Sequence, residues 1–208
     1  MNRNLYKIGF RAGMLAFYSN LAFVFVQTLQ LLGYLHYPYD EIFIYGFSLC
    51  IVIPFLIEML ALFYITPIDK KIWGHAALIF TEIYAVFVTA NYVVQLTTVI
   101  PATLQGNSDQ IKILIQTPHS LFWDFDAIGY ISMGIATLFA VPLFNKNGFQ
   151  KWVRYSFIAN VLVTPLIAVV YFYPVYSERL LLLGIPWAVT APLAMLLLAL
   201  MFKKEMMK

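Results

Sequence analysis

Long apolar stretches follow one another along the chain, and only a few polar residues interrupt each of them. A helix needs about 20 mostly apolar residues to cross the hydrocarbon core of a bilayer. The runs are apolar on every side, whereas the strands of a membrane β-barrel alternate between apolar and polar residues. The pattern therefore predicts an all-α integral membrane protein in which residues 1–208 form one bundle of six transmembrane helices. The six expected spans are about 10–34, 41–66, 74–100, 121–144, 152–174 and 180–202.

The overall composition agrees with a membrane protein. Hydrophobic residues make up 62% of the 208 residues and charged residues 11%, whereas a soluble domain typically carries about 25% charged residues. No linker rich in Gly, Pro or Ser separates the apolar stretches, so we expect one domain. Cys50 is the single cysteine, which excludes a disulfide within the chain.

Basic residues concentrate at alternate ends of the expected helices. If the N-terminus is cytoplasmic, the cytoplasmic segments hold eleven Lys and Arg against two acidic residues, and the outer segments hold two basic against six acidic residues. Short cytoplasmic loops are typically enriched in Lys and Arg. The bias predicts a multi-pass protein of the cell membrane with both termini in the cytoplasm. The net charge of +3 comes from these clusters, so we expect contact with the lipid bilayer and no nucleic-acid partner.

Two glutamates lie inside the expected spans at similar depth. Glu58 comes eight residues before Thr66, and Glu82 comes eight residues after Gly74. At 1.5 Å of rise per residue, both lie about 12 Å from the cytoplasmic boundary. The two helices are consecutive and antiparallel, so the carboxyl groups could face each other and share one proton, as in a proton or cation relay. Alternatively, each could be protonated and hydrogen-bonded to a different neighbour.

The span 74–100 is polar on two faces. With about 100° of rotation per residue, Asn91 and Gln95 fall nearly opposite Glu82. A polar group facing lipid is costly. We therefore expect this helix to be the central one of the bundle, with neighbours on both faces.

Further polar residues interrupt the first and fifth spans. They are Asn20, Gln27 and Asn160. Residues of this type often form hydrogen bonds between membrane helices. However, Gln27 and Gln30 fall in the same outer half as Asn91, Gln95 and Tyr171, so these side chains could instead line a polar cavity that opens outward.

The outer ends of the helices carry an excess of acidic residues and many aromatic ones. Asp124 and Asp126 would favour cations over anions at the mouth of such a cavity. Aromatic residues such as Trp123 and Tyr171 are typical of side chains that anchor helices at the membrane surface. We expect this anchoring role for them in preference to a ligand cage. Prolines inside the expected helices, at positions 54, 165, 186 and 192, predict kinks.

No motif for a hydrolase nucleophile, a zinc protease, a dinucleotide or a nucleotide phosphate occurs in the chain. His36, His75 and His119 show no spacing typical of metal ligands. We therefore expect no catalytic residues, no metal and no cofactor.

Three functions stay open on these grounds. The favoured one is binding or transport of a small solute near an intramembrane carboxyl pair, by the chain alone, as a homo-oligomer or as the membrane subunit of a larger transporter. The second is a membrane enzyme that acts on a lipid or quinone with Glu58 and Glu82 as acid and base. The third is a non-catalytic scaffold, sensor or immunity protein.

Overall fold

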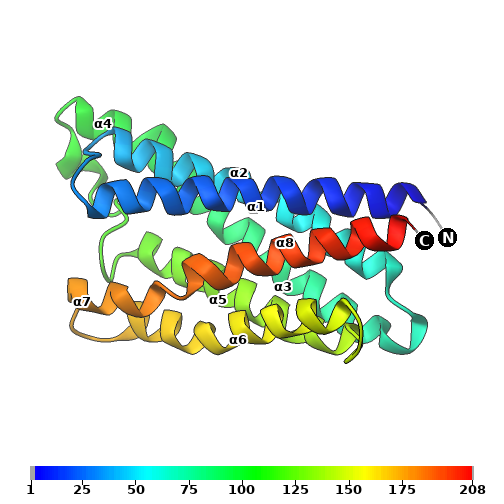
Figure 1. Cartoon of the computed structure of the whole chain (residues 1–208). Coiled ribbons are helices and arrows are strands. Elements are labelled where there is room, and N and C mark those ends of the chain that lie inside the picture. The colour runs from blue at the N-terminus through cyan, green and yellow to red at the C-terminus, as the bar shows by residue number, and fades with distance from the viewer. Residues whose placement is uncertain (1–2, 208) are drawn as a thin grey trace.

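Six long helices form most of the structure, a computed structural model that describes residues 3–207 (Figure 1). They are α1 (Arg3–Leu31), α2 (Tyr39–Ile65), α3 (Lys71–Val94), α5 (Leu121–Ala140), α6 (Gln150–Phe172) and α8 (Trp187–Met206). Short elements connect them: η1 (Ile68–Lys70), the π-helical turn η2 (Gln95–Val99), α4 (Ile100–Leu104), η3 (Ser108–Ile111), η4 (Val141–Leu143), α7 (Glu178–Leu181) and η5 (Leu182–Gly184). The described residues contain no strand. The predicted all-α fold with six long apolar helices is confirmed.

The long helices form a ring. Each packs against the long helices before and after it in the chain, and α8 closes the ring by packing against α1. Because the number of long helices is even, the chain begins and ends at the same end of the ring (Figure 1). We call this end the termini end. The opposite end, which carries the connections 32–38 and 105–120, is called the loop end.

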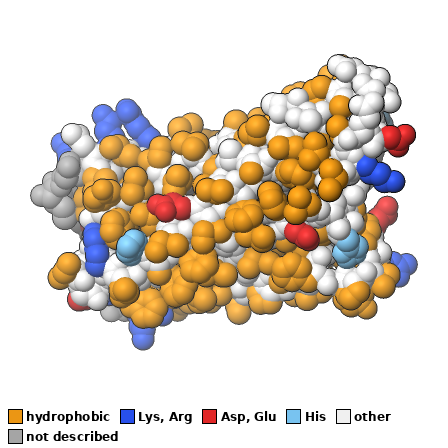
Figure 2. Space-filling view, turned by 180° about the vertical axis from the view of Figure 1, so that it is seen from behind, with side chains coloured by type: hydrophobic (Ala, Val, Ile, Leu, Met, Phe, Trp, Pro, Cys, Tyr) orange, Lys and Arg blue, Asp and Glu red, His pale blue; other side chains and the backbone are white. Residues whose placement is uncertain are grey.

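The outward faces of the ring are apolar. Figure 2 shows hydrophobic side chains across the middle of one face, with most Lys and Arg near the two ends. All six long helices are long and apolar enough to cross a membrane. Such a surface is costly in water but suits the hydrocarbon core of a bilayer. Exposed side chains that form it include Leu15, Phe25, Ile53, Val86, Leu138, Leu162 and Val189.

Small residues allow the helices to approach closely. A Cβ atom added at Gly134 on α5 would overlap the side chain of Thr164 on α6, and one added at Gly129 would overlap Val88 on α3. Close backbone approach of this kind is a main source of packing between membrane helices, because lipid provides no hydrophobic drive for them to associate. Alanines with no exposed surface extend the same packing: Ala16, Ala127, Ala136, Ala140 and Ala199.

The expectation that the third long helix is central is wrong. In the ring, α3 packs against α2 and α5. It buries Tyr84 and Asn91, but Glu82 and Thr89 on its other face are exposed. A helix in a closed ring has one inward face only, so the two polar faces of α3 meet different surroundings.

The prolines divide into two groups. Pro54, Pro165 and Pro192 lie inside α2, α6 and α8 as expected. Pro186, however, lies outside any helix and directly precedes α8. A proline fits well at a helix start because its missing N–H would have no partner there. The last apolar stretch is therefore built from α7, η5 and α8 instead of one continuous helix.

We expect Gly134→Ala to destabilise the protein by about 1–3 kcal/mol, because the added methyl group overpacks the contact with Thr164. Gly46→Ala on α2 is the matched control, since no atom lies within 4 Å of its Cβ position. Thermal unfolding in detergent, followed by circular dichroism, measures both. A similar drop in melting temperature for the two variants would contradict the assigned contact.

Candidate functional site

The carboxylate of Asp126 on α5 is the centre of a hydrogen-bond network at the loop end. The residue is 5% exposed. Its Oδ1 accepts hydrogen bonds from the Tyr92 hydroxyl at 2.7 Å and from Asn91 Nδ2 at 3.2 Å. Its Oδ2 accepts a hydrogen bond from the Tyr171 hydroxyl. Because the donors lie on α3 and α6, one carboxylate joins three neighbouring helices of the ring.

All the polar partners of Asp126 are neutral. They are the side chains of Tyr92, Tyr171, Asn91 and Gln116, and no Lys or Arg within residues 3–207 pairs with the carboxylate. A buried charge is costly unless hydrogen bonds or an opposite charge compensate it. Hydrogen bonds to an ionised acceptor are about twice as strong as neutral ones. When Asp126 is ionised, its negative charge is therefore stabilised by neutral hydrogen-bond donors.

Aromatic side chains surround this carboxylate. The hydroxyls of Tyr92 and Tyr130 lie 3.0 Å apart, and the ring of Tyr45 stacks on Tyr92 with a centroid distance of 5.2 Å. The ring of Trp187 packs against the ring of Tyr130, with 5.0 Å between the two ring centroids. The group draws on five helices of the ring: Tyr45 on α2, Tyr92 on α3, Trp123 and Tyr130 on α5, Tyr171 on α6 and Trp187 on α8.

The long connection 105–120 is tied to the same site. Gln95 donates from Nε2 to the carbonyl of Leu114 at 2.8 Å, and its Oε1 accepts from the backbone N–H of Gln116 at 3.2 Å. Asn91 Nδ2 also donates to Gln116 Oε1 at 3.0 Å. Gln95 begins the π-helical turn η2, and such turns are frequent at functional sites. These contacts hold residues 114–116 next to the Asp126 network.

A second acidic cluster lies at the loop end between α1 and α2. Gln27 Nε2 donates to Gln30 Oε1 at 2.6 Å, and Gln30 Nε2 donates to Asp40 Oδ2 at 2.9 Å. The backbone N–H of Glu41 donates to Asp40 Oδ1 at 2.8 Å. Tyr45 lies within electrostatic range of Asp40, Glu41 and Asp126. The loop end thus holds two carboxyl groups, those of Asp40 and Asp126, whose hydrogen-bond donors are neutral.

The expected polar residues of the outer half are only partly brought together. Asn91, Gln95 and Asp126 share one network, and Gln27 belongs to the neighbouring cluster with Asp40. Asp124 lies on the exposed side of α5 and takes no part in either. Asp124 and Asp126 have different surroundings because residues two positions apart in a helix point in different directions.

Two other predicted site residues serve helix packing. Asn160 on α6 donates from Nδ2 to Thr137 on α5 at 3.3 Å and accepts from Thr190 at 3.1 Å. Asn20 on α1 is buried, and its Nδ2 lies 3.9 Å from the sulfur of Met195 on α8. Both residues connect neighbouring helices, the role that amides often have in membranes.

The expected carboxyl pair is not formed. Glu58 is fully buried, and neither of its carboxyl oxygens has a hydrogen-bond partner. It faces Gly13 on α1, whereas Glu82 is exposed on the outward face of α3. Equal depth follows from the rise of each helix, but the direction of a side chain depends on the rotation of the helix. The hypothesis of a membrane enzyme with Glu58 and Glu82 as acid and base therefore lacks the close carboxyl pair that it requires.

Several members of the Asp126 network were missed in the sequence. Tyr130 follows Asp126 by four residues, so it lies on the same face of α5, and Tyr92 is adjacent to Asn91. These spacings could have signalled their roles. Tyr171 is expected both in the aromatic belt and among the polar side chains of the outer half, and Gln116 lies in a loop where no periodicity applies. Contacts between distant segments bring both of them to Asp126.

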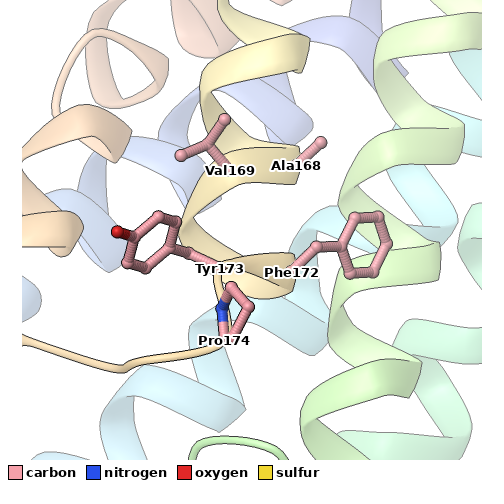
Figure 3. A pocket seen from close by; sticks show the side chains of 5 residues that line it. All are labelled: Ala168, Val169, Phe172, Tyr173 and Pro174. Atoms are coloured by element: carbon pink, nitrogen blue, oxygen red, sulfur yellow. The ribbon is translucent and has the colours of Figure 1, made fainter.

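Two pockets lie away from this network. A surface pocket of about 290 Å³ at the loop end of α6 is lined by apolar side chains and Tyr173 (Figure 3). A cavity of about 220 Å³ at the termini end is lined by residues of α1, α2, α6, α8 and the connections between the helices. Within residues 3–207, no group of three or more His, Cys, Asp or Glu side chains is placed to bind a metal ion.

Comparison of the chain with protein families, with curated proteins and with solved structures found no match. Two contacts of the Asp126 network can be tested directly.

We expect Asp126→Asn to destabilise the protein by about 1–3 kcal/mol, because the two tyrosine hydroxyls and the Asn91 amide lose an ionised acceptor. Asp124→Asn changes an exposed carboxylate and should stay within about 0.5 kcal/mol of wild type. Melting temperatures in detergent measure both variants. An equal drop in melting temperature for the two variants would contradict the stabilising role of the hydrogen bonds to Asp126.

We expect Gln95→Leu to loosen the connection 105–120, because it removes the hydrogen bonds to Leu114 and Gln116. If the lost hydrogen bonds lower the free energy of local opening by about 1.4 kcal/mol, amide hydrogen exchange in this connection becomes about tenfold faster. Gln105→Leu, at an exposed position, is the control and should leave exchange unchanged. Unaltered exchange near residues 114–116 in Gln95→Leu would show that these contacts do not hold the loop.

Proposed function

We propose that the protein binds a small organic cation at Asp126 and takes part in its transport across the cell membrane. The observation that carries the proposal is the buried carboxylate of Asp126, which is held by neutral donors among aromatic side chains. A cationic ligand would supply the opposite charge that the protein does not place there.

The chemistry of the surrounding groups supports an ammonium ligand. Aromatic faces attract cations within about 6 Å of the ring centroid, by about 2 kcal/mol or more where water is excluded. A carboxylate can accept several hydrogen bonds at once, so an ammonium N–H could join those that Asp126 already accepts. The hydroxyls of Tyr92, Tyr130 and Tyr171 can also accept hydrogen bonds by rotation of the O–H group.

The orientation of the chain supports entry from outside. We propose that the termini end lies in the cytoplasm, because eleven basic residues would then face two acidic ones there. The loop end, with Asp40, Glu41 and Asp126, would face outward. Acidic groups at a cleft raise the local concentration of cations. Separation of Gln116 from Gln95 and Asn91 would move residues 114–116 away from the site.

A second candidate function is a non-catalytic scaffold. It is favoured by the way the polar groups around Asp126 satisfy one another through hydrogen bonds across α3, α5 and α6. In that case the network would stabilise the ring and have no ligand. The two functions differ in whether a cation changes the stability of the protein through Asp126.

Thermal unfolding of the purified protein tests the proposal with tert-butylammonium and tetramethylammonium as probes. At a concentration of 100 times Kd, a ligand that binds only the folded state stabilises it by about 2.7 kcal/mol. We expect both cations to raise the melting temperature and tert-butanol, a neutral analogue of similar size, to leave it unchanged.

Two variants identify the site. We expect Asp126→Asn to abolish the shift caused by the cations, since the attracting charge is removed, and Asp124→Asn to retain it. A full shift in Asp126→Asn would overturn the assignment of the site. The absence of any cation effect on the wild type, together with a lower melting temperature of Asp126→Asn, would favour the scaffold.

A further inference from the structure

Glu58 is a buried carboxyl group that the proposed cation site does not use. We infer that Glu58 is a proton-binding site reached from the cavity at the termini end, and that the Phe202 ring forms the barrier between them. A role of this site in moving a proton together with a solute rests on the proposed function. The proton site itself is independent of that function, because Glu58 and Asp126 lie in different halves of the ring.

The surroundings of Glu58 accommodate a neutral carboxyl group. Neither oxygen has a hydrogen-bond partner, and the side chain has no exposed surface. An ionised carboxylate without donors or an opposite charge is very costly in such a place, so the group holds a proton. An ionisable residue inside a membrane span is a functional candidate because an apolar residue would fill the same space at lower cost.

No ionised group faces Glu58 from the helices around it. On α1 it meets Gly13, and Ala199 of α8 packs against the same glycine. The inward titratable side chain of α1 is Tyr6, two turns nearer the termini end. On α3 it is Tyr84, whose ring packs against Phe55 of α2. The lysines and arginines of α1, and the two lysines of α8, are exposed.

Gly13 makes the position of the carboxyl group possible. A Cβ atom at residue 13 would overlap the Glu58 carboxyl and would lie 2.8 Å from the Cβ of Ala199. Small residues on α1 and α8 thus leave a space that the side chain of Glu58 fills. The carboxyl group is therefore placed between helices by the packing itself and is directed away from lipid.

The cavity at the termini end reaches within about one helical turn of Glu58. It has a volume of about 220 Å³ and is lined by Leu62 and Thr66 of α2 and by Tyr6 of α1. Leu62 follows Glu58 by four residues, so both lie on one face of α2. The lining also includes the polar side chains of Asn145 and Gln150 and the charged ones of Lys70 and Glu205. A water molecule takes about 30 Å³ of liquid volume, so the cavity has room for several near these polar groups.

Phe202 lies between the cavity and the carboxyl group. Along one face of α1, Tyr6 lines the cavity, Gly9 contacts the Phe202 ring and Gly13 contacts Glu58. The Phe202 ring has no exposed surface and lies 2.8 Å from the Cβ position of Gly9. Rotation of this ring away from Gly9 would open a path along this face of α1 from the cavity to Glu58.

Other buried polar atoms continue from Glu58 toward the loop end. Among the described residues, Asn20 Oδ1 of α1 and Trp187 Nε1 of α8 have no hydrogen-bond partner, and Ser48 of α2 lies beside the Tyr130 hydroxyl. Buried polar atoms without a partner are rare and call for an explanation. The ring of Trp187 contacts Tyr130, which belongs to the Asp126 network. Asn20 Oδ1 and Ser48 Oγ can accept a hydrogen bond, whereas Trp187 Nε1 can only donate one.

Infrared spectroscopy of the protein in lipid nanodiscs tests the site. A protonated carboxylic acid has a C=O band separate from that of a carboxylate, and exchange into D₂O shifts it. We expect the wild type at neutral pH to show such a band, Glu58→Gln to lose the component that comes from Glu58, and the matched control Glu82→Gln to keep that component. Should Glu58→Gln fail to fold, Glu58→Asp keeps the acid and should shift the band.

The rate of the D₂O shift tests the barrier. We expect Phe202→Ala to speed the shift of the Glu58 band at least tenfold, because the ring no longer closes the path. Phe157→Ala, which removes an equally buried ring on α6, should leave the rate unchanged.

Three outcomes would overturn the inference. A carboxylic band that is the same in Glu58→Gln or Glu58→Asp, or one that never shifts in D₂O, would overturn the proton site. Equal rates in Phe202→Ala and wild type would overturn the barrier. None of these measurements uses a solute or Asp126, so failure of the cation site and failure of the proton site are distinguishable.

Discussion

The hydrogen bonds that the Asp126 carboxylate accepts hold the loop end of the ring together. They join α5 to α3 through Tyr92 and Asn91 and to α6 through Tyr171. Asn91 extends the same network to Gln116, so the connection 105–120 also depends on it. In a membrane, lipid offers no hydrogen bonds, and a buried charge must find its partners within the protein. The arrangement of three helices and one loop is thus tied to a single ionisable group.

The two buried carboxyl groups differ in what surrounds them. Asp126 has four neutral polar partners and aromatic neighbours, which suit a negative charge that attracts a cation. Glu58 has no hydrogen-bond partner and lies against Gly13, which suits a neutral acid. Solute binding at one half and proton exchange at the other are therefore compatible proposals. The unpaired polar atoms of α1 and α8 lie on two of the helices that would connect the two sites.

The residues on the outward faces suit a lipid environment. The outward faces are apolar, and small residues such as Gly134 and Gly129 bring α5 close to its neighbours. Packing between membrane helices depends on such close approach, since lipid is as apolar as the side chains it would replace. Glu82 is the exception, because it is exposed within the apolar stretch of α3. The ring leaves it outside because the inward face of α3 is occupied by Tyr84 and Asn91.

The sequence by itself determined the six apolar helices, because length and hydrophobicity are local properties of a segment. Bilayer thickness sets the number of apolar residues that a spanning helix needs. It also indicated that Asn91, Gln95 and Asp126 belong to one half of the molecule, since depth follows from the rise per residue. Only the tertiary structure decided which polar groups meet. Tyr92, Asn91 and Tyr171 form hydrogen bonds to Asp126, although they are separated from it by 34, 35 and 45 positions in the sequence. Glu58 and Glu82 share a depth but face different neighbours, because the rotation of each helix is set by packing against distant segments.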